Sequence, residues 1–374
     1  MRALLPLLPL SALSLPSQFL LRPPPRSSAC PCSDASLCAG PLPPADVELF
    51  GFGADGILDG GSFDWSAVTT IAWGEGDAVV CAAHANGVRV VAGVSPPLTD
   101  DQEEIAAWVT ATVDAVTGGH YDGVTFDYES PVSSISDPIN EQYLDVIAQT
   151  TKALKALSPN YQVSVCAAWS PLGIDGRFYD YAALANAVDF LYVMCYDTRS
   201  QIFDQCVASA NAPLPVCKKG IEDYLRLDIP AAKLILGVPW YGYRYECVDA
   251  SFDPAEDRTC GIAQVPFRGV NCSDAAGSEH TYAEIRGIVN GGGNSSEVWR
   301  DEYLNAPFFN YVDEESGKTY QVWYDDAVSL KPIYEMAKEL GLGGAGPYRW
   351  DQLDYAGNAA EAQEMMDAIK VVLN

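Results

Sequence analysis

The segment Tyr121–Ser130 reads YDGVTFDYES, in which polar and apolar side chains alternate up to a pair of acids, Asp127 and Glu129. Successive side chains of a β-strand point to opposite faces, so residues two positions apart share a face. A strand here places Thr125, Asp127 and Glu129 on one face. The other face carries Val124, Phe126 and Tyr128. The pattern therefore predicts a strand that brings two carboxylates together near its end.

Short apolar runs of this kind recur along the chain and alternate with helix-like stretches. We predict strands over residues 47–53, 69–74, 88–94, 123–129, 162–170, 189–197, 233–243 and 341–350. We predict helices over residues 101–117, 141–157 and 326–340. Eight apolar strands that alternate with helices favour an α/β fold, the (β/α)8 TIM barrel. A doubly wound open sheet is the alternative, although no G-x-G-x-x-G motif follows the first strand.

The interval 244–322 interrupts this alternation and is rich in Cys, Gly and aromatic residues. We predict an α+β insertion between the seventh and eighth strands, packed beside the mouth of the barrel. A long decorated loop without its own core is the alternative. Residues 30–243 would then hold the first seven barrel strands, and residues 323–374 would complete the barrel and add a C-terminal helix.

The N-terminus begins with one Arg and a Leu-rich run of signal-peptide length. We interpret residues 1–29 as a signal peptide and Pro-rich leader whose cleavage site is open. A second run of about twenty apolar residues is absent from the sequence, so we expect a soluble mature protein. The expected location is the secretory pathway, either the lysosome or the extracellular space. Asn271 and Asn294 lie in N-x-S sequons, which would accept glycans in a secreted protein.

Eleven cysteines fit an oxidising compartment. Two clusters are predicted to form local disulfides, namely Cys30, Cys32 and Cys38, and Cys247, Cys260 and Cys272. An odd count leaves at least one thiol unpaired. Zinc is the alternative for the first cluster, but the three histidines are scattered and the spacing is not that of a zinc finger. We therefore expect no metal site.

The formal net charge of −28 argues against binding to nucleic acid, whose phosphates the surface would repel. The same charge argues against docking on anionic membranes. An acidic surface suits a secreted or vesicular protein that handles a neutral substrate. We expect a monomer.

The active site of a TIM barrel lies at the C-terminal ends of its strands. Several predicted strands end in acids or aromatic residues: Asp127, Glu129, Trp169, Tyr196, Asp197, Trp240, Tyr241 and Tyr243. Two neighbouring acids can divide the work of catalysis, because proximity and burial raise the pKa of one of them. Aromatic rings suit the C–H faces of sugars. The alternative is that the acids solubilise a strand end and the aromatic residues belong to the core.

Two of these segments resemble signatures of glycoside hydrolase family 18, the chitinase family. YDGVTFDYE is similar to its D-G-x-D-x-D-x-E motif, and MCYD at 194–197 looks like its M-x-Y-D strand end. Further strings resemble the chitobiase branch of that family, in the same order from about residue 30 to the end: AWSP (168–171), GVPWYGY (237–243), PFRG (266–269), CSDAAG (272–277) and QVWYDD (321–326). The resemblance implies hydrolysis of the β-1,4 bond in chitobiose units, with GlcNAc released from the reducing end of free N-glycan-type or chitin oligosaccharides.

The resemblance also implies roles for three residues. Glu129 occupies the position of the general acid, and Asp127 that of the acid which accepts the acetamido N–H and stabilises the positive intermediate. Tyr196 matches the tyrosine that aligns the acetamido oxygen. The family has no protein nucleophile, because the acetamido group of the substrate attacks the anomeric carbon, with retention of configuration; it is an exception to the rule of two catalytic carboxylates. The chemistry needs no metal and no cofactor.

The sequence departs from the family pattern at two places. Thr125 stands where the motif has its middle acid, so the implied activity would show a shifted pH profile. Thr125 and Asp122, the first acid of the motif, are expected to support the site. At the eighth strand the family has a Trp that floors the sugar site, whereas PYRWDQLDY offers Tyr348 or, after a two-residue slip, Trp350. We slightly favour Trp350 because its ring is larger.

The remaining candidates for substrate binding each have a structural alternative. Asp197 would be a subsite or supporting acid. Trp240 and Tyr241 would contact sugar or close the top of the barrel. Arg268 would contact substrate or support the insertion through ion pairs, and Trp323 and Asp325 would bind sugar or fix the insertion in place.

Two further functions are open at this point. An endo-chitinase would use a long open cleft, whereas a short closed cleft would favour the chitobiase activity. A non-catalytic, lectin-like sugar-binding protein is disfavoured because such members usually lack the catalytic Glu, which is present here as Glu129.

Overall fold

A computed structural model of the chain describes residues 29–59, 61–291 and 295–373. All but the last residue of the predicted leader, residues 1–29, lies outside the described residues, as does Asn294. Eight parallel strands close into a barrel in the order β1-β13-β7-β6-β5-β4-β3-β2. These strands are β1 (Glu48–Phe52), β2 (Thr70–Ala72), β3 (Arg89–Val94), β4 (Gly123–Phe126), β5 (Gln162–Ala168), β6 (Phe190–Met194), β7 (Leu234–Pro239) and β13 (Gly344–Tyr348). The predicted TIM barrel is confirmed.

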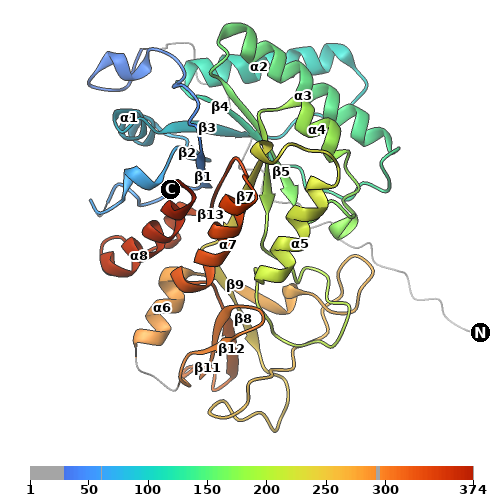
Figure 1. The fold of residues 1–374 in the computed structure, drawn as a ribbon, viewed down its shortest axis with the longest axis vertical. Helices are drawn as coiled ribbons and strands as arrows, with labels where there is room; N and C mark the ends of the chain where they lie inside the picture. Colours follow the sequence, from blue (N-terminus) through green and yellow to red (C-terminus); the bar gives the residue numbers. More distant parts are fainter. Residues whose placement is uncertain (1–28, 60, 292–294, 374) are drawn as a thin grey trace, which may run out of the picture.

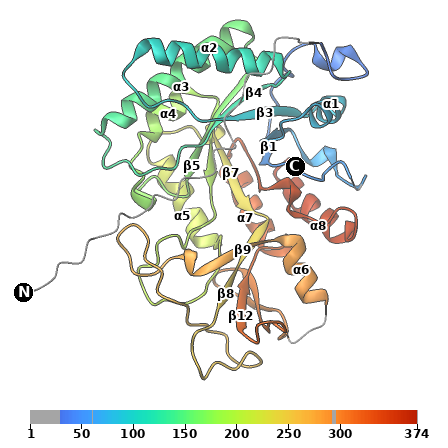
Figure 2. The same cartoon turned by 180° about the vertical axis from the view of Figure 1, so that it is seen from behind.

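Helices pack around the outside of the barrel, as Figures 1 and 2 show from opposite sides. They are α1 (Asp77–Ala85), α2 (Gln102–Gly118), α3 (Pro138–Leu157), α4 (Tyr181–Ala187), α5 (Leu214–Leu225), α7 (Ala327–Glu339) and α8 (Ala359–Ile369). Single 3-10 turns occur at Ala35–Cys38, Trp65–Ala67, Ile174–Gly176, Ala231–Lys233, Asp274–Ala276, Trp350–Gln352 and Lys370–Leu373. Asp101 and Asp137 begin α2 and α3 by accepting hydrogen bonds from backbone N–H groups of the first turn. No helix of the described residues is long and apolar enough to cross a membrane.

The alternation predicted for β4 is present. Phe126 points outward against Trp108 of α2 and Tyr143 of α3, and Val124 belongs to the same outer core. Thr125 is fully buried and points inward, with its hydroxyl 4.0 Å from the sulfur of Cys166 on β5. The strand ends at Phe126, so Asp127 and Glu129 follow it at the C-terminal mouth of the barrel.

The chain leaves the barrel after β7 to form a second sheet, which lies below the barrel in Figure 1. This antiparallel sheet has the order β10-β11-β12-β8-β9. Its elements are β8 (Tyr241–Glu246), β9 (Gly277–Thr281), α6 (Tyr282–Asn290), β10 (Trp299–Asp301), β11 (Ala306–Val312) and β12 (Thr319–Trp323). The insertion predicted between the seventh and eighth barrel strands is confirmed. The strand predicted over 233–243 is divided at Trp240, because Tyr241 already pairs with β9 of the insertion.

Five disulfides join ten of the eleven cysteines: Cys30–Cys38, Cys32–Cys81, Cys195–Cys217, Cys206–Cys272 and Cys247–Cys260. The prediction of purely local pairing is wrong for Cys32 and Cys272, which reach α1 and the β6–α5 loop. Cys166 is the unpaired thiol that the odd count requires. Multiple disulfides indicate an oxidising compartment, the secretory pathway.

Candidate active site

Asp127 and Glu129 occupy different environments at the mouth of the barrel. The Oδ1 atom of Asp127 is buried, whereas the side chain of Glu129 is 53% exposed. Burial and the neighbouring charge of Glu129 raise the pKa of Asp127 to about 7, against the opposing effects of Arg177 and the Cys166 thiol. Asp127 therefore retains the proton of this acidic pair up to about neutral pH.

Arg177 lies beside this pair and was not expected from the sequence. Its Nη1 atom donates to Oε2 of Glu129, and its Nη2 atom donates to Oδ2 of Asp175 at 2.9 Å. Arg177 and Asp175 are both buried. Burial is the largest single effect and lowers the pKa of the guanidinium, but the charges of Glu129 and Asp175, together with two nearby phenols, raise it overall. The cation therefore holds the Glu129 carboxyl group in one position.

Aromatic rings cluster at the C-terminal ends of the barrel strands, on the same side of the barrel as the acids. The ring of Tyr348, at the end of β13, lies 5.5 Å from that of Tyr196, which follows β6, and 6.1 Å from that of Trp73, which follows β2. The charge of Asp127 acts on the phenols of both Tyr196 and Tyr348, whose pKa values are raised mainly by burial. Tyr196, Tyr348 and Asp127 therefore face a common region at the C-terminal ends of the strands.

Trp350 lies elsewhere, in contrast to our preference for it as the sugar-site floor. Its side chain is completely buried and packs edge-on against Trp240, with ring centroids 5.3 Å apart. Trp240 is equally buried and donates from its indole N–H to the hydroxyl of Tyr334 on α7 at 3.3 Å. Neither ring has surface that a sugar could contact, so the structural alternative holds for Trp240. The two-residue slip does not occur, and Tyr348 is the ring at the mouth.

Asp197 follows Tyr196 and accepts hydrogen bonds from the hydroxyls of Tyr241 and Tyr243, at 2.5 and 3.1 Å. Burial, together with the charges of Asp274 and Glu279, raises the pKa of Asp197 to about 8 although the two phenols lower it. Its backbone has a φ of 49°, a left-handed conformation that non-glycine residues rarely adopt. Asp197 and Tyr241 thus form a polar cluster where the barrel meets the insertion.

The insertion reaches back to the acidic pair through Arg268. Its guanidinium donates to the backbone oxygen of Asp175 and, at 3.5 Å, to that of Glu129. The amide of Gln201 donates to the Arg268 carbonyl at 2.8 Å. The structure therefore brings Arg268 to the Glu129 side of the mouth, where it contacts main-chain groups rather than forming an ion pair.

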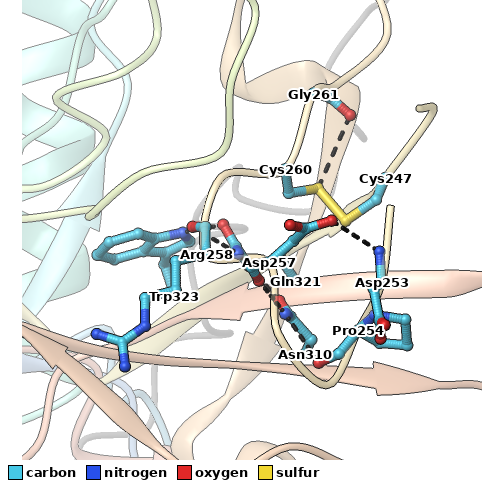
Figure 3. Close-up of a disulfide and its surroundings, with 10 residues drawn as sticks. All are labelled: Cys247, Asp253, Pro254, Asp257, Arg258, Cys260, Gly261, Asn310, Gln321 and Trp323. Carbon is cyan, nitrogen blue, oxygen red and sulfur yellow. Dashed lines mark hydrogen bonds between the residues drawn. A yellow bond between two sulfur atoms is a disulfide. The ribbon is translucent and has the colours of Figure 1, made fainter. Parts of the chain in front are cut away.

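Trp323 and Asp325 stabilise the insertion and its connection to the barrel. Figure 3 shows Trp323 beside Gln321, to which its indole N–H donates at 2.8 Å. Gln321 in turn binds the backbone of Arg258, in the loop closed by Cys247–Cys260. Trp323 also stacks on Phe308, 4.2 Å between ring centroids.

Asp325 is 1% exposed and accepts a hydrogen bond from Ser329 in the first turn of α7. Burial raises its pKa to about 7. The near-complete burial of Trp323 and Asp325 favours the structural alternative, in which they fix the insertion in place.

Asp122 lies at the opposite end of the barrel from Asp127, because it precedes β4 whereas Asp127 follows it. It accepts hydrogen bonds from the backbone N–H groups of Leu42 and Val90, each at 2.7 Å, and its carboxylate lies 2.8 Å from Nε2 of His84. The expected supporting role at the active site is therefore wrong for Asp122. His84 is buried, and its pairing with Asp122 anchors the N-terminal segment.

Sequence patterns missed Trp73, Asp175, Arg177 and Cys166. Trp73 ends a predicted strand and could have been found by the same strand-end rule that found Tyr196. Asp175 and Arg177 lie in a loop after β5, where no periodicity indicates which side chains turn inward. Cys166 occupies an inner position of β5 and could have been assigned from strand parity.

The arrangement combines a carboxyl group with a raised pKa, Asp127, a second and more exposed carboxyl group, Glu129, and a cluster of aromatic rings. This is the chemistry of acid-catalysed cleavage of a sugar linkage.

Comparisons with known proteins agree with this geometry. The family described as glycosyl hydrolases family 18 matches residues 94–352. Di-N-acetylchitobiase of Rattus norvegicus is 39% identical over 348 residues, covering 91% of this chain and 92% of that protein. Di-N-acetylchitobiase of Homo sapiens is 38% identical over 350 residues, covering 91% and 88%. A probable di-N-acetylchitobiase 2 of Dictyostelium discoideum is 39% identical over 352 residues, covering 91% and 90%.

Solved structures share the fold at low sequence identity. A class V chitinase from Nicotiana tobaccum superimposes with a TM-score of 0.67 at 15% identity, covering 87% of this chain and 99% of that one. An Ostrinia furnacalis group IV chitinase in complex with allosamidin superimposes with a TM-score of 0.68 at 15% identity, covering 88% and 99%. These likenesses concern the fold alone.

Proposed function

Because the chain belongs to the glycosyl hydrolases of family 18 and is a glycosidase similar to the di-N-acetylchitobiases, we propose that it hydrolyses the β-1,4 bond of chitobiose units. The substrate would be a free oligosaccharide with GlcNAc at its reducing end, and the product a single GlcNAc. The observation that carries the proposal is the acidic pair. In it Asp127, whose Oδ1 atom is buried, neighbours the half-exposed Glu129, which Arg177 holds in place.

In the proposed first step, Glu129 donates its proton to the glycosidic oxygen as the bond to the anomeric carbon breaks. The acetamido oxygen of the same sugar attacks that carbon and forms an oxazolinium ion. Asp127, as a carboxylate, accepts the acetamido N–H and stabilises the positive charge, while Tyr196 orients the acetamido oxygen. Glu129 then removes a proton from water, which opens the ring and leaves the β-configuration unchanged.

The protonation of the acidic pair in the substrate-free site suits this use of Glu129, first as an acid and then as a base. The acidic pair retains one proton up to about pH 7, since burial and the charge of Glu129 raise the pKa of Asp127. An acetamido N–H directed at Asp127 stabilises its charged form and so moves the shared proton to Glu129. Substrate binding would therefore protonate Glu129, the proposed general acid.

The contacts on the far side of Glu129 support a short leaving-group site. Because the general acid protonates the leaving oxygen, the leaving sugar must lie beside Glu129 and near Arg177 and Arg268. The loops that carry these arginines are in contact, because Arg268 donates to the backbone oxygen of Asp175. Gln201 also joins them, since its side chain accepts from the Asp175 N–H and donates to the Arg268 carbonyl. Loops that contact each other on this side of Glu129 favour release of one sugar over binding of a long chain.

Several carboxyl groups near the mouth favour an acidic working pH. Burial raises the pKa of Asp197 to about 8 and that of Asp274 to about 7. Both groups are neutral at the pH of an acidic vesicle, so the site is compatible with an acidic compartment; the proposed location is the lysosome or the extracellular space. The exposed Asn271 sequon is a proposed glycan site.

One digestion experiment tests the proposed function. Chitobiose, chitotetraose and a free high-mannose glycan ending in chitobiose would be incubated with the protein side by side, and the products weighed by mass spectrometry. The proposal expects loss of one GlcNAc from each substrate that ends in chitobiose. Release of chitobiose from the middle of chitotetraose would instead indicate an endo-chitinase. Binding without cleavage would indicate a lectin-like protein.

A further inference from the structure

Polar but uncharged groups line the interior of the barrel beneath Asp127. Thr125 and Ser164 are fully buried, and Cys166 is 7% exposed. Thr125 of β4 stands opposite Ser164 of β5 in the strand register. Asp127 directly follows the end of β4, and continuation of this register places it opposite Cys166 of β5. The thiol thus lies directly beside the carboxyl group that faces the substrate in the proposed mechanism.

The contacts of Cys166 connect it to both neighbours on β4. Its sulfur lies 4.0 Å from the Thr125 hydroxyl oxygen, and its thiol lowers the pKa of the Asp127 carboxyl group. The Oδ1 atom of Asp127 is buried and accepts no hydrogen bond within the described part of the chain. A thiol is a weak donor, but a weak donor matters at a buried carboxyl group that is short of donors.

Cys166 is available as a donor because it keeps its proton. Burial and the charges of Asp127 and Glu129 raise the pKa of its thiol well above the usual value. The other ten cysteines are paired in disulfides. Cys166 therefore carries the single S–H group of the chain.

We propose that Cys166 is a positioning residue for Asp127, whose S–H group, backed by the Thr125 hydroxyl, donates to the Asp127 carboxylate while that carboxylate accepts the substrate's acetamido N–H. The proposal rests on the proposed function for its role in catalysis. A neutral donor orients the carboxylate without adding a further negative charge to the acidic pair. An acidic side chain in place of either Thr125 or Cys166 would raise the pKa of Asp127 further and keep that carboxyl group protonated.

The first test needs no substrate. Infrared spectroscopy of the wild-type protein would follow the S–H stretching band, which belongs to Cys166 alone. The proposal expects this band to move to lower frequency as pH rises through about 7, when the Asp127 carboxyl group ionises and accepts more strongly. In Asp127→Asn the band should no longer move with pH. If the frequency of the S–H band does not change with pH in the wild-type protein, the proposal is overturned, whatever the substrate proves to be.

The second test separates hydrogen bonding from packing. Cys166→Ala removes the donor, whereas Cys166→Ser retains one, and Ser164→Ala is the control on the same inner face. Loss of the donor raises the pKa of Asp127, so the alkaline limb of the pH profile of kcat/KM should move upward by roughly 0.5–1 pH unit in Cys166→Ala. The limb should stay in place in Cys166→Ser and in Ser164→Ala. Equal shifts in Cys166→Ala and Cys166→Ser, or no shift in either, would overturn the proposal.

The two tests fail independently of the proposed function. A protein that cleaves none of the chitobiose substrates would refute that function, yet the infrared band would still decide whether the thiol donates to Asp127. If Cys166→Ala fails to fold, the infrared comparison of wild type with Asp127→Asn still gives the answer.

Discussion

The guanidinium of Arg177 donates a hydrogen bond to the carboxylate of Glu129, which places a buried cation in contact with the proposed general acid. When Glu129 gives up its proton, a negative charge develops where the cation already lies. Preorganised charges of this kind need no rearrangement as the reaction proceeds. Arg177 is also the link from Glu129 to the buried Asp175.

We expect Arg177→Met to lower kcat/KM by roughly 10- to 100-fold, because Glu129 loses its fixed position. The same change leaves Asp175 buried without its cation and should lower the free energy of unfolding by about 3–5 kcal/mol. Arg177→Lys keeps the charge but not the forked geometry and should be intermediate. Steady-state kinetics and urea unfolding measure the two effects.

The control for Arg177 is Lys318→Met, which removes an exposed ion pair with Glu246. Its effects on stability and on kinetics should both be negligible, because the pair is exposed to solvent. Wild-type kcat/KM in Arg177→Met would contradict the account of Glu129.

Glu129→Gln should lower turnover of chitobiose by several orders of magnitude, since an amide donates no proton to the leaving oxygen; general acid catalysis alone contributes roughly 10²- to 10⁴-fold. The fold should be intact, because the amide oxygen still accepts from Arg177. Glu141→Gln, at an exposed position of α3, is the matched control. Near-normal hydrolysis by Glu129→Gln would exclude it as the acid.

Tyr348 and Trp350 should respond in opposite ways. Tyr348→Ala removes the ring next to Tyr196 and should lower kcat/KM by roughly one to two orders of magnitude, whereas Tyr348→Trp should stay active. Trp350→Ala removes a fully buried ring and should cost about 3–5 kcal/mol of stability. Thermal unfolding and kinetics on all three variants distinguish the roles; an effect of Trp350→Ala on kcat/KM without loss of stability would place the floor at Trp350 after all.

The stability of the protein should decline between about pH 4 and pH 8. Burial raises the folded-state pKa of Asp197 to about 8, above the value of about 3.9 for an unfolded Asp. The folded state therefore binds the proton more tightly, and its contribution is complete below pH 4 and lost as pH rises through 8. The side-chain oxygen in Asp197→Asn still accepts a hydrogen bond from Tyr241, so the stability of this variant should decline less steeply with pH. Urea midpoints at pH 5 and pH 8 measure it, and an equal slope in both proteins would contradict the raised pKa.

The barrel could be predicted from sequence because its signal is local. Each strand buries both faces, so strands appear as apolar runs, and the alternation in β4 correctly separated Thr125 from Phe126. Asp127 and Glu129 were found by the same argument, because a strand end in a barrel is also an edge of the mouth.

The parts that could not be predicted depend on contacts between distant segments. Asp122 and Asp127 belong to one motif, yet they lie at opposite ends of β4, and only the fold shows that Asp122 binds His84. Trp350 is larger than Tyr348, but burial against Trp240 decides which ring is accessible. Cys272 pairs with a cysteine 66 residues away, which spacing along the chain does not indicate.

The central claim is that the acetamido group of the substrate is the attacking group, and a series of chitobiose analogues tests it most directly. The acetyl methyl group of the cleaved sugar would carry zero, one, two or three fluorine atoms, which progressively weaken the carbonyl oxygen as a nucleophile. If the acetamido oxygen is the attacking group, kcat falls steeply with each fluorine added. A kcat that stays constant across the series would contradict it.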